Sequence, residues 1–110
     1  PVITAISNDT GYENLFVNQL KIHFKKKDIV ILISASGNSK NLILAAKWIK
    51  KMKGTTFSLL GFDGGNLKKL SDDYILIKSA KGDYGPVEDS HLIINHILAH
   101  WFQKNLLKKK

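Results

Sequence analysis

The chain has 110 residues, 44% of them hydrophobic, and a net charge of +8 at pH 7. This size and composition are typical of one compact domain with an apolar core, and they argue against disorder and against a multidomain array. Cysteine is absent, which removes disulfides, thiolate metal sites and cysteine nucleophiles from consideration. No apolar run approaches the roughly 20 residues that span a bilayer and no segment resembles a secretory signal, so we expect a cytoplasmic protein without a membrane partner.

The positive charge comes entirely from lysine, which supplies all 17 basic residues and is clustered at residues 25–27 and 108–110. Proteins that read DNA bases usually rely on the planar fork of arginine, which is missing here. A basic surface can attract an anionic substrate or associate loosely with nucleic acid, but a charge run specifies no partner by itself. We therefore expect a solvated lysine-rich surface and no specific nucleic-acid partner.

The first predicted element is a strand over residues 2–7, and a helix follows in which Phe16, Leu20 and Phe24 recur at one-turn spacing. Residues 29–33 form an unbroken run of isoleucine, valine and leucine, which is typical of a strand buried on both faces of a parallel sheet. Because the chain starts directly at a core strand, without a polar lead-in, we expect that it lacks the N-terminal part of its domain.

The remaining elements continue this alternation. A helix is predicted over residues 41–52, strands over 55–60 and 74–77 with a short helical turn at 67–70 between them, and a last helix over about residues 86–107. Alternating strands and helices predict a parallel sheet, because each right-handed crossover needs a helix to return the chain.

The expected fold class is therefore α/β, a single domain over residues 1–110 with a doubly wound parallel sheet and helices on both faces. In such sheets ligands bind beyond the carboxyl ends of the strands. Polar or glycine-rich segments follow the four predicted strands in turn, at residues 8–9, 34–39, 63–65 and 82–88. We expect these segments to line one pocket.

The loop over residues 34–39 reads Ser-Ala-Ser-Gly-Asn-Ser and directly precedes a predicted helix. Unpaired amides at a helix N-terminus and the helix dipole attract a dianion, and serine hydroxyls can donate to its oxygens, so phosphate is the expected ligand. The same composition is also ordinary helix capping, and the residues alone leave both interpretations open. The loop is neither a Walker motif nor a dinucleotide fingerprint, which disfavours a nucleotide.

The last helix carries the candidate metal ligands. Glu88 and His96 are eight residues apart, which places them about 80° apart around the helix and ~12 Å apart along it, so only converging side chains could share an ion. His96 and His100, spaced i and i+4, are a tighter pair that could equally bind a metal. His91 and His100 are otherwise expected to be partly buried or surface imidazoles.

Four segments of the chain resemble sugar isomerase (SIS) domains, in family order and spacing. They are Asn-Asp-Thr-Gly-Tyr at residues 8–12, the serine loop with Ile33, Gly-Phe-Asp-Gly-Gly at residues 61–65, and the helix from Glu88 to His96. The serine loop is typical of SIS domains in general. The final helix is most similar to that of phosphoheptose isomerases, which interconvert sedoheptulose 7-phosphate and D-glycero-D-manno-heptose 7-phosphate.

The resemblance implies a role for each matching residue. The serines would hold the substrate phosphate and Asp9 would contact sugar hydroxyls, within a substrate-binding set of Ser34, Ser36, Asn38, Ser39, Asp9 and Asp63. His96 would be a catalytic acid/base and a zinc ligand, Glu88 would stand at the position of the family's glutamine ligand, and the other ligands would lie upstream of residue 1. The resemblance also implies a homotetramer with active sites at subunit contacts.

Two departures from the family pattern bear on the substrate. Glu88 replaces the usual glutamine by a carboxylate, which can still ligate a metal but adds negative charge, and Gly85-Pro86 replaces an Asp-Arg pair. The expected activity is aldose–ketose isomerisation of sedoheptulose 7-phosphate or a related phosphorylated sugar, through removal of the proton beside the carbonyl and an enediol. The alternative is a non-catalytic SIS module that binds a sugar phosphate or a protein partner.

Overall fold

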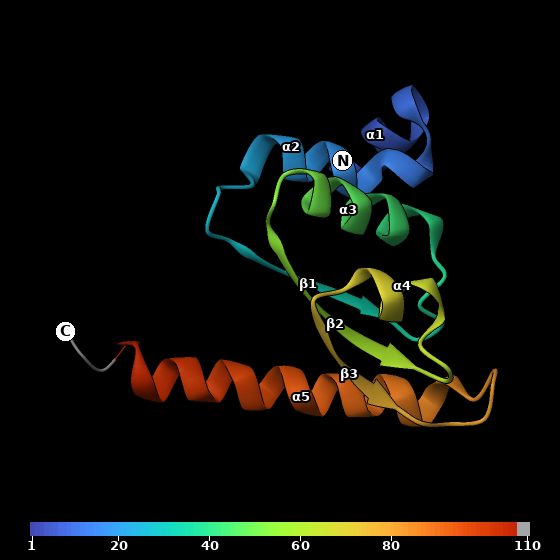
Figure 1. The fold of residues 1–110 in the computed structure, drawn as a ribbon, viewed down its shortest axis with the longest axis vertical. Helices are drawn as coiled ribbons and strands as arrows, with labels where there is room; N and C mark the ends of the chain where they lie inside the picture. The colour runs from blue at the N-terminus through green and yellow to red at the C-terminus, as the bar shows by residue number, and fades with distance from the viewer. Residues whose placement is uncertain (108–110) are drawn as a thin grey trace.

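The computed structural model describes residues 1–107 and shows a parallel sheet lying between helices (Figure 1). The sheet of the described residues has three strands in the order β1-β2-β3, with β1 at Ile29–Ser34, β2 at Thr55–Gly61 and β3 at Asp73–Ile77. Both strand pairs are parallel. The carboxyl ends of all three strands therefore meet at one edge of the sheet.

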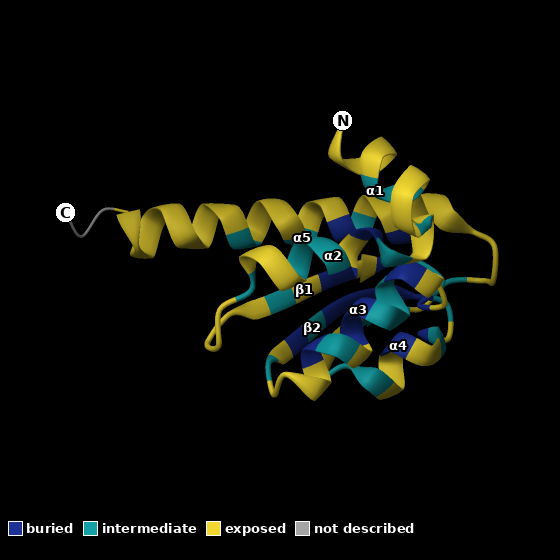
Figure 2. Ribbon diagram, turned by 90° about the horizontal axis from the view of Figure 1, so that it is seen from above, coloured by how far each residue is buried: buried dark blue, intermediate teal, exposed yellow. Residues whose placement is uncertain are grey.

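The helices lie on both faces of this sheet, as Figures 1 and 2 show from two directions. On one face α3 packs on β1 and β2 beside α4, and α2 packs on the outside of α3; on the other face α5 crosses β2. The bounds are α1 Val2–Thr10, the 3-10 helix η1 Tyr12–Asn14, α2 Leu15–His23, α3 Lys40–Lys51, α4 Gly65–Leu70 and α5 Tyr84–Asn105. The α/β fold class with helices flanking a parallel sheet is confirmed.

The strand predicted over residues 2–7 is wrong, because this segment forms helix α1. None of its residues is buried, and Val2 and Ile3 are 51% and 60% exposed. A strand must find its hydrogen-bond partners on another strand, whereas a helix satisfies its own backbone groups. The hydroxyls of Thr4 and Thr10 add bonds to the carbonyls of Pro1 and Ile6. The β-branched residues of this segment are therefore accommodated on the outside of a short helix.

The other predicted strands are confirmed, but β1 is not buried on both faces. Its residues alternate, so that Leu32 and Ser34 are 3% and 8% exposed while Ile29, Ile31 and Ile33 are 66%, 47% and 52% exposed. The reason is that α5 covers β2 rather than β1, which leaves one face of β1 open among the residues that the structure describes.

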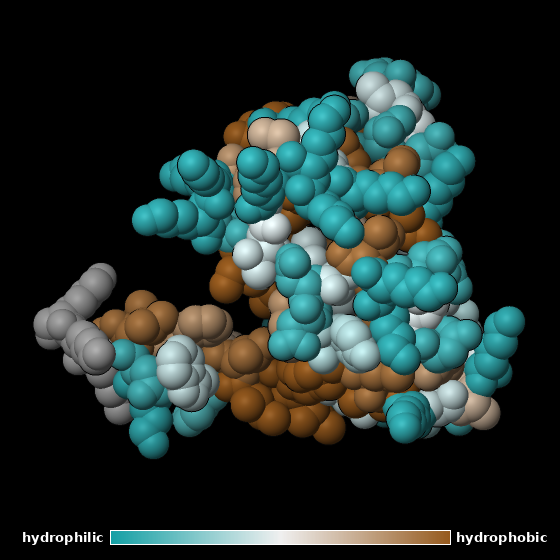
Figure 3. Space-filling view, in the orientation of Figure 1, coloured by the Kyte–Doolittle hydropathy of each residue, from teal (hydrophilic) through white to brown (hydrophobic). Residues whose placement is uncertain are grey.

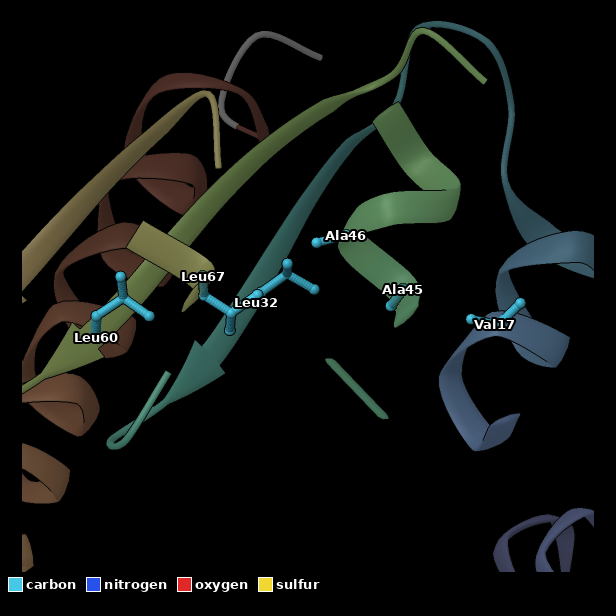
Figure 4. Close-up of a cluster of buried hydrophobic side chains, with 6 residues drawn as sticks. All are labelled: Val17, Leu32, Ala45, Ala46, Leu60 and Leu67. Carbon is cyan, nitrogen blue, oxygen red and sulfur yellow. The ribbon is translucent and has the colours of Figure 1, made fainter. Parts of the chain in front are cut away.

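The apolar core lies between the sheet and α3, with contributions from α2 and α4. Figure 4 shows its buried members: Val17, Leu32, Ala45, Ala46, Leu60 and Leu67. The two adjacent alanines of α3 are fully buried, and their small side chains allow the helix to approach the strands closely. This close packing fixes the N-terminal end of α3 beside the carboxyl end of β1, where the serine loop connects them.

Candidate functional site

The serine loop, residues 34–39, connects β1 to α3 and is shaped by hydrogen bonds within itself. The Gly37 amide donates to Ser34 Oγ over 3.0 Å, and the Asn38 amide donates to Ser36 Oγ over 3.2 Å. Gly37 has a φ of +68° and lies so close to Gly64 that a Cβ would collide with the Gly64 carbonyl oxygen. Only glycine can take this position.

The N-terminus of α3 is presented directly by this loop. Ser39 is the N-cap residue, and its carbonyl accepts hydrogen bonds from the Leu42 and Ile43 amides. Its side chain makes no capping hydrogen bond, so the capping role that the sequence left open is not filled by the Ser39 hydroxyl. The first amides of a helix have no partner within the helix. The loop therefore offers the half-buried Ser36 hydroxyl and the exposed Ser39 hydroxyl beside the positive end of a helix dipole.

A second loop, between β2 and α4, closes against the serine loop. Asn38 Oδ1 accepts a hydrogen bond from the Asn66 amide over 2.9 Å, and the Leu67 amide donates to the Gly37 carbonyl over 2.9 Å. Asp63 Oδ1 accepts from the Gly65 amide over 2.9 Å. Asn38 and Asp63 thus each use one side-chain oxygen to hold the loops in place.

The two loops and the segment after β3 surround a hollow of about 330 Å³ at the carboxyl edge of the sheet, which we call the serine hollow. Its lining consists of Ser36, Asn38, Phe62, Asp63, Ser79 and Lys81. Of the residues predicted to bind substrate, the hollow brings together Ser36, Asn38 and Asp63. Ser34 is buried at the end of β1, where the loop begins, and Ser39 lies exposed at the start of α3.

Sequence reasoning missed Ser79 and Lys81 as candidate site residues. Both follow the carboxyl end of β3. The segment that we expected to line the pocket after this strand began only at residue 82, three residues after Ser79. Lys81 supplies a positive charge to a hollow that otherwise contains the Asp63 carboxylate and neutral groups. The rule that ligands bind beyond the carboxyl ends of strands, applied from the last residue of β3 onward, would have included both.

Asp9 is exposed at the end of α1 and does not line this hollow. The prediction that it follows a core strand is wrong, because residues 2–10 are helical. The following 3-10 helix η1 packs on α3, and its Glu13 forms an ion pair with Lys40 at the start of α3 at 3.8 Å.

Glu88 and His96 are both exposed on α5, and neither lines the serine hollow. His96 lines a different hollow, of about 590 Å³, which it shares with His100 and the apolar residues Ile93, Ile97 and Trp101. Within residues 1–107, no three His, Asp or Glu side chains come close enough to hold a metal ion together. The described residues by themselves therefore do not fit a zinc centre.

His91 is more deeply buried than the sequence suggested, with 6% of its surface exposed. Its Nε2 lies 2.9 Å from the Leu60 carbonyl oxygen, near the carboxyl end of β2. His100 is exposed, as expected.

Comparison with curated proteins identifies relatives of this chain. It is 45% identical over 105 residues to the phosphoheptose isomerase of Leptospira biflexa and 38% identical over 107 residues to that of Helicobacter pylori. The chain is a relative of the phosphoheptose isomerases. These matches cover 96% and 97% of this chain but 53% and 55% of the relatives, so the chain spans about half the length of the curated proteins it matches. No family model matches it.

Solved structures of phosphoheptose isomerases share its fold. Those from Francisella tularensis and Neisseria gonorrhoeae both align with a TM-score of 0.77, at 26% and 29% sequence identity. The alignments cover 88% and 87% of this chain, and 51% and 54% of those chains. The resemblance to phosphoheptose isomerases drawn from the sequence motifs is confirmed.

Proposed function

We propose that residues 1–110 form a single SIS domain of a phosphoheptose isomerase, and that the full-length protein interconverts sedoheptulose 7-phosphate and D-glycero-D-manno-heptose 7-phosphate. The observation that carries this proposal is the identity of 38–45% to proteins named phosphoheptose isomerase over nearly the whole chain. The arrangement of the serine loop at the carboxyl edge of the sheet supports it, because this is where an α/β sheet binds its ligand.

The serine loop is the proposed phosphate site. Ser36 and Ser39 have accessible hydroxyls, and Ser34 Oγ accepts a hydrogen bond from Gly37, which leaves the hydroxyl hydrogen of Ser34 able to donate. The N-terminus of α3 adds backbone amides and a favourable dipole. Asn38 and Asp63 lie at the same hollow, where we place the hydroxyl groups of the sugar, and Asp9 would approach it from the neighbouring α1 segment.

His96 is the proposed proton-transfer group of this chain. Isomerisation removes a proton from the carbon beside the carbonyl, forms an enediol, and returns a proton to the neighbouring carbon, which needs a correctly placed acid/base. Since His96 lies on α5 and not at the serine hollow, the active site in this proposal is completed by residues beyond those described, at a contact between subunits.

A zinc site in the proposed enzyme would need further ligands from outside residues 1–107. Glu88 and His96 would then be two of its ligands, and the metal would supply Lewis-acid stabilisation of the oxyanion. No step of the chemistry above depends on it.

We also propose that the full-length protein is a cytoplasmic homotetramer. Along α5 from Leu92 onward, five large apolar residues are between 47% and 61% exposed, namely Leu92, Ile93, Ile97, Trp101 and Phe102. Figure 3 shows hydrophobic surface gathered along this helix, and exposed patches of this kind mark interaction sites. The absence of cysteine is in keeping with the cytoplasm. Among the described helices, none has the length and apolar character needed to cross a membrane.

A non-catalytic sugar-phosphate-binding module is the second candidate, favoured by the separation of His96 from the serine hollow. Calorimetry and turnover of the full-length protein separate the two. Conversion of sedoheptulose 7-phosphate supports the isomerase, whereas binding without conversion supports the module.

A further inference from the structure

Helix α5 is anchored to the sheet through a narrow strip of its surface. In the described part of α5, only Val87 and His91 are buried, at 0% and 6% exposure. They are spaced i and i+4 and therefore lie on one face of the helix, one turn apart. Val87 packs over Gly61, where an added Cβ would come within 2.5 Å of Val87 Cγ1. The first contact is thus a close apolar fit against bare backbone.

The second contact is a hydrogen bond. His91 Nε2 lies 2.9 Å from the Leu60 carbonyl oxygen in a buried setting. A carbonyl can only accept, so Nε2 carries the proton and donates it. Losing this donor would leave a buried carbonyl without that partner, which is costly. A hydrogen bond also prefers a narrow range of angles, whereas apolar packing allows a helix to rotate about its own axis.

The positions of Glu88 and His96 depend on how α5 is rotated about its own axis. Viewed down the helix axis, Glu88 lies about 60° from His91, and His96 lies about 140° from it. Rotating α5 by about 15° would move an atom that is ~6 Å from the axis by about 1.5 Å. Misplacement of a reacting group by about 1 Å can cost ~100-fold in rate.

We propose that His91 is a positioning residue, whose hydrogen bond to the Leu60 carbonyl fixes the rotation of α5 and so places Glu88 and His96 relative to the serine loop. This proposal rests on the proposed isomerase function. It differs from a plain core-packing role, because an apolar side chain of similar size would fill the same space but would not fix the angle.

The test compares two substitutions in the full-length protein. His91→Leu fills the space with an apolar side chain and removes the donor. His91→Gln keeps a donor at the same reach, since its Nε2 is four bonds from Cα, as in histidine. For His91→Leu we expect kcat for sedoheptulose 7-phosphate to fall about 10- to 100-fold while KM changes less than about threefold, because the phosphate loop is untouched. His91→Gln should recover kcat to within about threefold of wild type, and the exposed control His23→Gln should match wild type.

Wild-type kcat in His91→Leu, or a folded His91→Gln protein with kcat as low as His91→Leu, would overturn the proposal. If a thermal melt shows that His91→Leu does not fold, His91→Gln alone decides. A kcat within about threefold of wild type then supports the proposal, and a folded His91→Gln protein with a kcat lowered about 10-fold or more overturns it. A wild-type protein without turnover would instead reject the proposed function. In that case crystal structures of the wild type and a folded variant decide: a rotated α5 in His91→Leu, or in a donor-free His91→Phe if the former does not fold, supports the positioning role, and an unrotated α5 rejects it.

Discussion

The three serines of the loop over residues 34–39 differ in what their hydroxyl groups can do. Ser34 is buried and Ser36 is half-buried, and each accepts a hydrogen bond from an amide of the loop, whereas Ser39 is exposed and its side chain makes no capping bond. The oxygens of Ser34 and Ser36 thus shape the turn, while all three hydroxyl hydrogens are able to donate to an anion.

Ser36→Ala should weaken binding of a sugar phosphate by about 1.5–3 kcal/mol, because a charge-assisted hydrogen bond is lost. The measurement is isothermal titration calorimetry of the full-length protein with sedoheptulose 7-phosphate. Thr55→Ala is the matched control, since Thr55 begins β2 at the opposite edge of the sheet. The Thr55→Ala protein should bind the sugar phosphate with wild-type affinity. An unaltered affinity in Ser36→Ala would reject the phosphate site.

Gly37→Ala should destabilise the fold by about 2–4 kcal/mol, through the cost of a positive φ and a collision with the Gly64 carbonyl oxygen. Gly82 also has a positive φ, of +91°, but an added Cβ there would have no other group within 4 Å. Gly82→Ala should therefore cost only about 1–2 kcal/mol. Urea denaturation of both variants measures the difference, and equal losses would contradict the close approach of the two loops.

Residue by residue, the sequence predicted the candidate site in part. Ser36, Asn38 and Asp63 were expected in one pocket and do line one hollow. Lys81 was missed because the segment predicted to follow β3 began at residue 82, although the strand ends at Ile77. The burial of His91 was missed because its partner is a backbone carbonyl 31 positions away, and sequence spacing does not reveal such a contact.

At the scale of elements, prediction succeeded where hydrophobic periodicity and turn residues agreed. β1, β2, β3 and α3 were expected within a residue or two of their observed bounds. The segment over residues 2–7 was assigned wrongly, because a short apolar run does not distinguish a strand from a helix. The open face of β1 was also unexpected, since the burial of a strand depends on where the crossing helix lies.

Helix α5 carries His96, the residue whose replacement tests the proposed catalysis. His96→Ala in the full-length protein should lower kcat for isomerisation by about 10²–10⁴-fold, because general acid/base groups contribute that much. Calorimetry should show binding of sedoheptulose 7-phosphate within about threefold of wild type, because the serine loop lies elsewhere. The exposed Gln103→Ala substitution on the same helix is the control. Turnover near wild type in His96→Ala would remove this residue from the mechanism.

At the scale of the whole molecule, the long helix α5 extends beyond the sheet and leaves apolar side chains uncovered in the described chain (Figures 1 and 3). Ile97 and Trp101, spaced i and i+4, are 61% and 53% exposed. An exposed stripe of this kind is stabilised when another apolar surface covers it.

The full-length protein should therefore sediment as a dimer or tetramer, and Ile97→Lys combined with Trp101→Glu should shift it to a smaller species. Analytical ultracentrifugation at several concentrations measures this. Lys47→Glu combined with Lys50→Glu, on the exposed side of α3, is a charge-changing control that should leave the assembly intact. A wild type that is monomeric at every concentration would contradict both the assembly and a site shared between subunits.

We propose that this α/β domain belongs to an enzyme that isomerises a phosphorylated seven-carbon sugar. The most direct test follows the conversion of sedoheptulose 7-phosphate by NMR, using the full-length protein supplied with zinc. We predict formation of D-glycero-D-manno-heptose 7-phosphate with a turnover above about 1 s⁻¹, the lower end of typical enzyme rates. Binding of the sugar phosphate without any conversion would contradict the claim and would identify the protein as a non-catalytic binding module.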